Sequence, residues 1–108
     1  MNKFNDEVLE MKNLHNELTD NLFKGILSLK SIDECYDFFF DLCTITEIKD
    51  MSQRLQLAQL INDGLSYQQI FDKTGVSTAT IGRVKKCVDY GEGGYETVLN
   101  RLKEAEGK

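Results

Sequence analysis

The sequence predicts a small all-α protein, and three observations support that fold class. Proline, the strongest helix breaker, is absent from the 108 residues. Apolar residues recur three or four positions apart, the spacing that places them on one face of a helix. At three places a serine or threonine precedes a glutamate or glutamine by three positions, a pattern typical of helix N-termini. The length fits a single domain.

The first expected helix covers residues 5–29. Asn5 is placed to cap it, and Asp6 and Glu7 follow in the first turn, where acidic side chains suit the helix dipole. Apolar residues continue at helical spacing, at Val8, Met11, Leu14, Leu18 and Leu22. We expect any bend or break at Gly25. The apolar face either covers the rest of the domain or pairs with a second copy, and the pattern does not choose between them.

A short second helix is expected from the Ser31 and Glu34 pair through Leu42. Phe38, Phe39 and Phe40 are consecutive in it, and three consecutive side chains of a helix cannot all face one core. At least one ring must therefore point to a different surface. That requirement indicates burial on several sides or against a second subunit.

The next helix is expected from the Thr44 and Glu47 pair to about Asp63. Its expected core face consists of Ile48, Met51, Leu55, Ala58 and Ile61. Three shorter helices follow, over residues 66–74, 78–88 and 95–106. In the last of them we expect the inward side chains to be Val98, Leu99 and Leu102.

Residues 66–89 have the pattern of a helix-turn-helix. Gly75 stands at the joint, where a left-handed backbone lets two helices cross at a steep angle. The side chains expected to pack inside the corner are Ile70, Val76, Ile81 and Val84. This packing leaves small residues outside at the start of the second helix, namely Ser77, Thr78, Ala79 and Gly82.

Small side chains there allow a helix to lie deep in the major groove of DNA, with its free N–H groups facing phosphates or base acceptors. Lys85 and Lys86, together with Arg83, are placed to bind phosphates at the groove edge. The full set of predicted DNA contacts is Tyr67, Gln68, Ser77, Thr78, Ala79, Gly82, Lys85 and Lys86. The alternative is a helical hairpin with a polar outer face and no nucleic-acid partner.

The charge distribution agrees with a localised DNA contact. The net charge is −5, but nine of the acidic residues lie within residues 1–43, where only four lysines balance them. The dense basic cluster is Arg83, Lys85 and Lys86. Electrostatic binding to DNA is therefore expected at one surface only.

The remaining composition excludes several classes of protein. The three cysteines, Cys35, Cys43 and Cys87, form no CxxC pair, and His15 is the sole histidine, so no metal site is expected. The thiols are expected to be reduced. No apolar run approaches the ~20 residues of a membrane span, and the polar N-terminus lacks a signal pattern. We expect a cytoplasmic protein.

From Thr44 to Lys86 the chain resembles the Trp repressor family, and in particular its Trp-repressor-like members. The resemblance rests on Thr44, Glu47, Gln53, Arg54, Gly64, Ser66, Gln68 and the run from Thr78 to Arg83. It implies an all-α, intertwined helical homodimer with two helix-turn-helix heads. Within a single domain, residues 1–43 would then be dimerisation helices, 44–90 the central helix with the helix-turn-helix, and 91–108 a C-terminal helix.

The resemblance also implies an effector site, because the family holds tryptophan between two arginines. The matching residues and their neighbours here are Thr44, Arg54, Thr80, Arg83, Val84 and Cys87. Cys87 replaces a serine of the family, and Val84 replaces a glycine, which puts a branched side chain where the indole would lie. Ala58, a valine in the family, restores some of that room. The sequence therefore disfavours L-tryptophan and leaves another amino-acid-like effector, or no cofactor at all, as the alternatives.

The leading hypothesis is a sequence-specific, dimeric transcriptional regulator, expected to be a repressor, whose partners are double-stranded DNA and a second copy of the chain. A helical protein–protein interaction module that does not bind DNA is the alternative, and the acidic net charge favours it. An enzyme is not expected, because no carboxylate pair, nucleophile–base set or phosphate loop is placed for catalysis.

Overall fold

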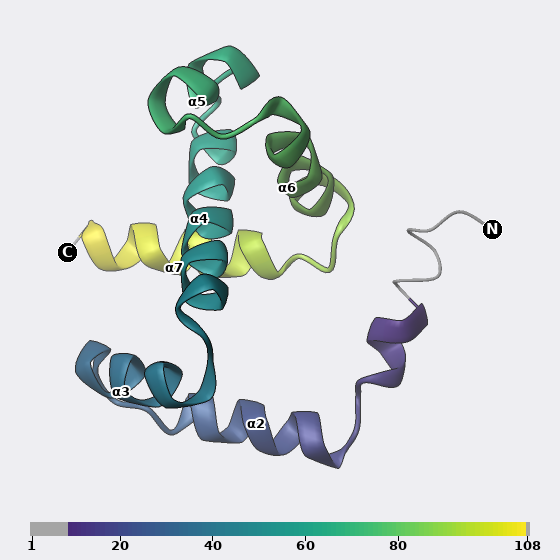
Figure 1. The fold of residues 1–108 in the computed structure, drawn as a ribbon, viewed down its shortest axis with the longest axis vertical. Coiled ribbons are helices and arrows are strands. Elements are labelled where there is room, and N and C mark those ends of the chain that lie inside the picture. The colour runs from purple at the N-terminus through teal and green to yellow at the C-terminus, as the bar shows by residue number, and fades with distance from the viewer. Residues whose placement is uncertain (1–8, 108) are drawn as a thin grey trace. The chain divides into compact units, whose positions relative to one another are not determined.

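The computed structural model describes residues 9–107, and its regular secondary structure over that range is entirely helical (Figure 1). After a helical turn at residues 9–13, the helices are α2 (Glu17–Leu27), α3 (Ile32–Leu42), α4 (Ile45–Asn62), α5 (Tyr67–Thr74), α6 (Thr78–Tyr90) and α7 (Gly94–Glu106). The all-α prediction is therefore confirmed. The chain divides between Cys43 and Thr44 into two compact units.

The single helix expected over residues 5–29 is wrong, because the chain leaves the helix at Leu14–Asn16. Asn16 is extended, with φ −145°, and its side chain accepts a hydrogen bond of 3.0 Å from the Thr19 N–H, which starts α2 afresh. Gly25, the expected break, lies inside α2. The expected cap at Asn5, with Asp6, Glu7 and Val8, lies outside the described residues.

Helix α3 begins at Ser31, whose hydroxyl accepts the Glu34 N–H at 3.1 Å. The Glu34 carboxylate accepts the N–H of Lys30 at 2.9 Å rather than that of Ser31, so the expected capping box is displaced by one residue. Phe38 and Phe39 are half-buried, while Phe40 is 61% exposed and stacks at an angle on Tyr36. The rings of Phe38 and Phe39 meet edge to face, with centroids 5.7 Å apart, so Phe40 is the ring that faces a different surface.

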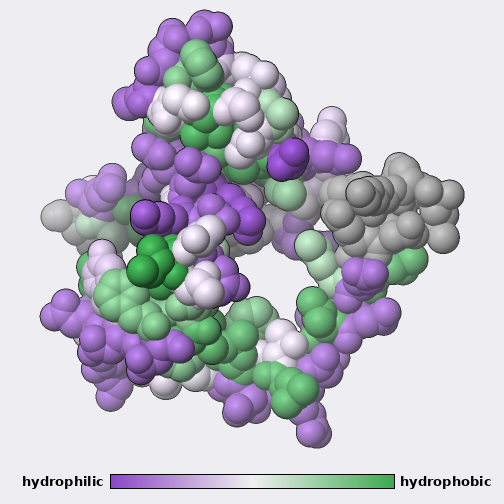
Figure 2. Space-filling model, in the orientation of Figure 1, coloured by the Kyte–Doolittle hydropathy of each residue, from purple (hydrophilic) through white to green (hydrophobic). Residues whose placement is uncertain are grey.

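The described part of the first unit, residues 9–43, contains no buried residue. Neither α2 nor α3 contains a buried residue. Large apolar side chains are exposed along both helices, including Leu18 at 86%, Leu27 at 83% and Ile32 at 75%. Figure 2 shows the resulting hydrophobic surface, which extends over both α2 and α3.

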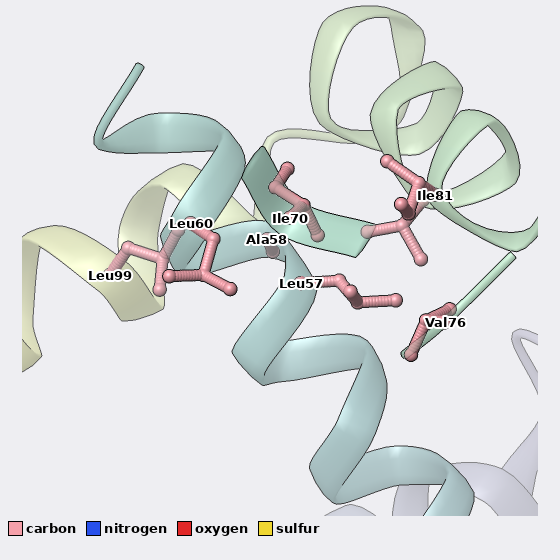
Figure 3. Packing of buried hydrophobic residues seen from close by; sticks show 8 residues of the cluster. Leu57, Ala58, Leu60, Ile70, Val76, Ile81 and Leu99 are labelled. Atoms are coloured by element: carbon pink, nitrogen blue, oxygen red, sulfur yellow. The ribbon is translucent and has the colours of Figure 1, made fainter. Parts of the chain in front are cut away.

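The second unit has a core where α4, α5, α6 and α7 meet. Leu57, Ile70 and Ile81 are fully buried, one from each of α4, α5 and α6 (Figure 3). Leu60 of α4 faces Leu99 of α7 on the other side of the cluster. The core therefore fixes α5 and α6 on the end of α4.

The core face of α4 differs from the expected one. Leu57, Ala58 and Leu60 are buried, and of these the sequence pattern selected only Ala58. In α7 only Leu99 is buried, whereas Val98 and Leu102, which were also expected to face inward, are 45% and 39% exposed. No helix in the described range is long and apolar enough to cross a membrane.

Candidate nucleic-acid interface

The helix-turn-helix expected at residues 66–89 is present as a corner between α5 and α6. Ser66 and Gln69 form a complete capping box that starts α5, with bonds of 3.2 and 2.8 Å. Gly75 ends the helix with φ +73°, a left-handed value that favours glycine. The turn hydroxyl of Thr74 donates to the Ile70 carbonyl and accepts the Val76 N–H, which satisfies the backbone on both sides of the joint.

Four apolar residues expected inside the corner are all buried. They are Ile70, Val76, Ile81 and Val84, and none is more than 9% exposed. Because these side chains come from both helices and from the turn between them, they lock the angle at which α6 leaves α5 (Figure 3). The N-terminal end of α6 is consequently held on a rigid support.

Ser77 caps α6, and its hydroxyl is engaged within the helix. The hydroxyl accepts the Thr80 N–H at 3.3 Å, and its O–H donates to the Thr80 Oγ1 at 3.1 Å. Thr78 and Ala79 are exposed in the first turn. All three residues lie at the tip of α6, its N-terminal end. Thr78 and Ala79 have the outward side chains there, while Ser77 caps the backbone N–H groups.

Gly82 is less open than the sequence indicated. A Cβ atom at Gly82 would lie 3.8 Å from the hydroxyl oxygen of Tyr67, so the ring of Tyr67 reaches from the start of α5 to the middle of α6. The sequence placed both residues among the predicted DNA contacts, with Gly82 among the small residues of the outer face. The structure brings them together, with Gly82 half-buried and Tyr67 38% exposed.

Two predicted contacts are already paired with acidic residues. The Lys85 ammonium lies 3.0 Å from the Asp89 carboxylate, and the Gln68 amide donates to the Asp72 carboxylate at 2.8 Å. The hydrogen bond and charge of Asp89 raise the pKa of Lys85, with smaller contributions from Tyr67 and Tyr90. Arg83 and Lys86 are exposed on the same helix.

Of the six residues of the expected effector site, Thr44, Thr80 and Val84 are engaged within the second unit. The Thr44 hydroxyl caps α4, and the Thr80 hydroxyl bonds to Ser77. Val84 is 6% exposed and belongs to the core. Arg54, Arg83 and Cys87 are exposed. A groove of about 220 Å³ between α4 and α7 is lined by none of these six residues.

Sequence reasoning missed Tyr95, which lies near two of these residues, Arg54 and Cys87. Tyr95 is half-buried and packs against the core from the start of α7. Burial raises its pKa, the charge of Cys87 raises it further, and Arg54 lowers it, so both groups lie within electrostatic reach of the phenol. In the sequence, Tyr95 stands out only as an aromatic residue directly after a glycine-rich joint. The position of its side chain depends on how α7 crosses α4.

No group of three or more His, Cys, Asp or Glu residues is arranged to hold a metal ion within residues 9–107. Cys35, Cys43 and Cys87 are free thiols.

Comparisons with known proteins agree on one family. The family model described as Trp repressor protein matches residues 17–103. An uncharacterized Bacillus subtilis protein, YerC, is 49% identical over 98 residues, which cover 91% of this chain and 94% of the relative.

Two crystal structures are similar to the chain along most of its length. A TrpR-like protein from Eubacterium eligens superposes with a TM-score of 0.81 at 47% identity, covering 85% of this chain and 95% of that one. A candidate Trp repressor from Staphylococcus aureus also has a TM-score of 0.81, at 44% identity, and covers 86% of this chain and 93% of its own.

Proposed function

The chain belongs to the Trp repressor family, as a YerC-like member, and from this premise we propose that it binds double-stranded DNA as a homodimer and represses transcription. The family consists of regulators rather than enzymes. Such a regulator acts in the cytoplasm, where bacterial DNA is accessible.

The observation that carries the proposal is the exposed tip of α6. Thr78 and Ala79 project from its first turn, and the buried corner around Ile81 holds that turn rigidly away from the rest of its unit. B-DNA has a major groove about 12 Å wide, which admits a helix whose leading side chains are small. The first-turn N–H groups and the Thr78 hydroxyl are donors that suit base acceptors and phosphates.

The exposed apolar faces of α2 and α3 support the homodimer. Every cell that makes this chain contains further copies of it, and each copy has a matching apolar surface. Symmetric dimers are also the commonest oligomers. Two heads related by twofold symmetry would enter successive major grooves about 34 Å apart. The operator should therefore be an inverted repeat.

We further propose that the repressor does not require L-tryptophan. Val84 fills core space instead of leaving room for an indole, and the Thr44 and Thr80 hydroxyls are engaged in helix caps. Isothermal titration with L-tryptophan should give no saturable heat. Saturable binding would show that Val84 does not obstruct the site, and screening other amino acids in the same way tests for a different effector.

Selection of bound sequences from a random duplex pool tests DNA binding and the dimer together. We expect an inverted repeat with half-sites about one helical turn apart. Thr78→Glu should lose binding by 100-fold or more, because it places a carboxylate against the phosphates and base acceptors, on the order of 3 kcal/mol. Thr46→Glu is the matched control, since it makes the same change in the first turn of α4 and should bind normally.

The alternative function is a protein–protein interaction module, and the exposed rings and aliphatic chains of α3 favour it. Salt titration separates the two functions, because phosphate contacts release counterions and DNA affinity then falls steeply as salt rises. Failure to recover any enriched duplex, with Thr78→Glu and wild type behaving alike, would leave the interaction module as the better account.

A further inference from the structure

We propose that Asp89 competes with DNA phosphates for Lys85 and thereby lowers the sequence-independent part of the affinity for DNA. The inference rests on the proposed function, because it concerns the surface that would face the duplex. It assigns a role to an acidic residue that is not itself one of the proposed DNA contacts.

The geometry begins with the ion pair on α6. The Lys85 Nζ and Asp89 Oδ2 atoms are 3.0 Å apart, one helical turn from each other. The two side chains are 42% and 39% exposed, so a phosphate can reach the ammonium from outside. Lys85 also lies within electrostatic reach of Tyr67, whose hydroxyl is beside Gly82. The ion pair is therefore adjacent to the proposed interface, on the helix that carries the tip.

Helix stability does not account for an aspartate at this position. Asp89 occupies the last turn of α6, where the partial negative charge of the helix end disfavours an acid. An acidic residue four positions after a lysine is also the weaker orientation for a helical ion pair. An exposed pair of this kind contributes little to folding, so its effect should fall mainly on what Lys85 can bind.

When the Lys85 ammonium is paired with the Asp89 carboxylate, its positive charge is less available to a DNA phosphate. If Lys85 turns to the duplex, the carboxylate is left unpaired beside a line of negative phosphates. If Lys85 stays paired with Asp89, the protein makes one phosphate contact fewer, and the counterion that this contact would have released stays on the DNA. Both outcomes weaken binding, and both act on any base sequence because phosphates carry no sequence information.

The same arrangement recurs on α5, where Asp72 accepts a hydrogen bond from Gln68 at 2.8 Å. Here the partner is a neutral amide, so the pair takes no positive charge away from the phosphates. Asp72 should therefore restrain DNA binding less than Asp89 does. Asp89 on α6 and Asp72 on α5 should thus oppose DNA binding to different degrees.

The test measures duplex affinity against salt for wild type, Asp89→Asn, Lys85→Gln and the double variant. Asp89→Asn should bind both the selected operator and a random duplex about threefold more tightly, with a slope of log affinity against log salt steeper by up to about 0.9. Lys85→Gln should weaken binding in both backgrounds, because Lys85 is itself a predicted phosphate contact. Once Lys85 is replaced, Asp89→Asn should give no gain, so the double variant should bind like Lys85→Gln. Asp72→Asn should give a smaller gain.

Asp63→Asn is the matched control, because Asp63 pairs with Lys103 at 3.6 Å between the end of α4 and α7, and neither residue is a proposed DNA contact. Its affinity and salt slope should equal those of wild type. The inference is overturned if Asp89→Asn leaves affinity and slope unchanged, or if its gain survives in the double variant or appears equally in Asp63→Asn. Failure of the proposed function looks different, since neither wild type nor Asp89→Asn would then bind any duplex.

Discussion

The two units of this chain both carry large apolar side chains, but within residues 9–107 only the second unit buries any of them. Leu57, Ile70 and Ile81 are inaccessible to solvent, while Leu18 and Leu27 of the first unit are more than four-fifths exposed. Burial of an aliphatic side chain is worth about 2 kcal/mol, and exposure forfeits it. The second unit thus contains its own driving force for folding, whereas the described part of the first unit, residues 9–43, buries no side chain that could supply one.

The largest effect that we expect comes from placing a charge on the open apolar surface of the first unit. In a monomer, Leu27→Asp would hardly change the melting temperature, because Leu27 is 83% exposed. If a second copy covers this residue, the buried carboxylate should dissociate the dimer and lower its melting temperature by more than about 10 °C, from about 3 kcal/mol or more of desolvation.

Sedimentation velocity and thermal melts measure both consequences. Tyr90→Asp is the matched control, because Tyr90 is 76% exposed at the end of α6 and should tolerate the charge. A Leu27→Asp protein that remains dimeric and melts with the wild type would show that the first unit is not the dimer interface.

A smaller effect should come from a cavity in the second unit. Ile81→Ala removes three carbon atoms from a fully buried site and should cost about 3 kcal/mol of unfolding free energy, measured by urea denaturation. Ile32→Ala makes the same change in the first unit at a residue that is 75% exposed. Equal costs for the two variants would indicate that Ile32 is as well covered in the assembled protein as Ile81. A negligible cost for Ile32→Ala would place it outside any interface.

The smallest effect should arise from the capping box at the start of α4. Hydrogen bonds with the backbone N–H of Thr44 and with its side chain lower the pKa of the Glu47 carboxyl below its ordinary value near 4.5. A carboxyl with a lowered pKa in the folded state adds stability above its unfolded pKa and loses it as the pH falls through the folded one. Glu47→Gln should therefore reduce the loss in melting temperature between about pH 7 and about pH 3. An identical loss in both proteins would contradict this role.

Local signals accounted for much of the fold. The Thr44 and Glu47 pair, the Ser66 and Gln69 pair and Gly75 each specify the backbone over a few residues, and all three act as the sequence indicated. The break at Asn16 was missed because Met11, Leu14 and Leu18 keep helical spacing across it. Asn16, followed by the acids Glu17 and Asp20, was an available cap signal that the apolar pattern outweighed.

Features that depend on long-range packing could not be derived in this way. Leu57 and Leu60 are buried because α5, α6 and α7 all approach that side of α4, and no local pattern gives those approaches. Tyr95 reaches the neighbourhood of Arg54 and Cys87 for the same reason. The pairs of Lys85 with Asp89 and Gln68 with Asp72 have the spacing of helical neighbours, but that spacing alone does not decide whether two exposed side chains meet.

The lack of buried residues in α2 and α3 has a consequence for newly made chains. If a second copy covers these helices, as proposed, the first unit completes its folding in a bimolecular step, and the completed fraction rises with the amount of protein present. Scarce chains would keep an incomplete first unit open to proteases, while abundant chains would protect one another. The level of active regulator would then depend more than proportionally on its rate of synthesis.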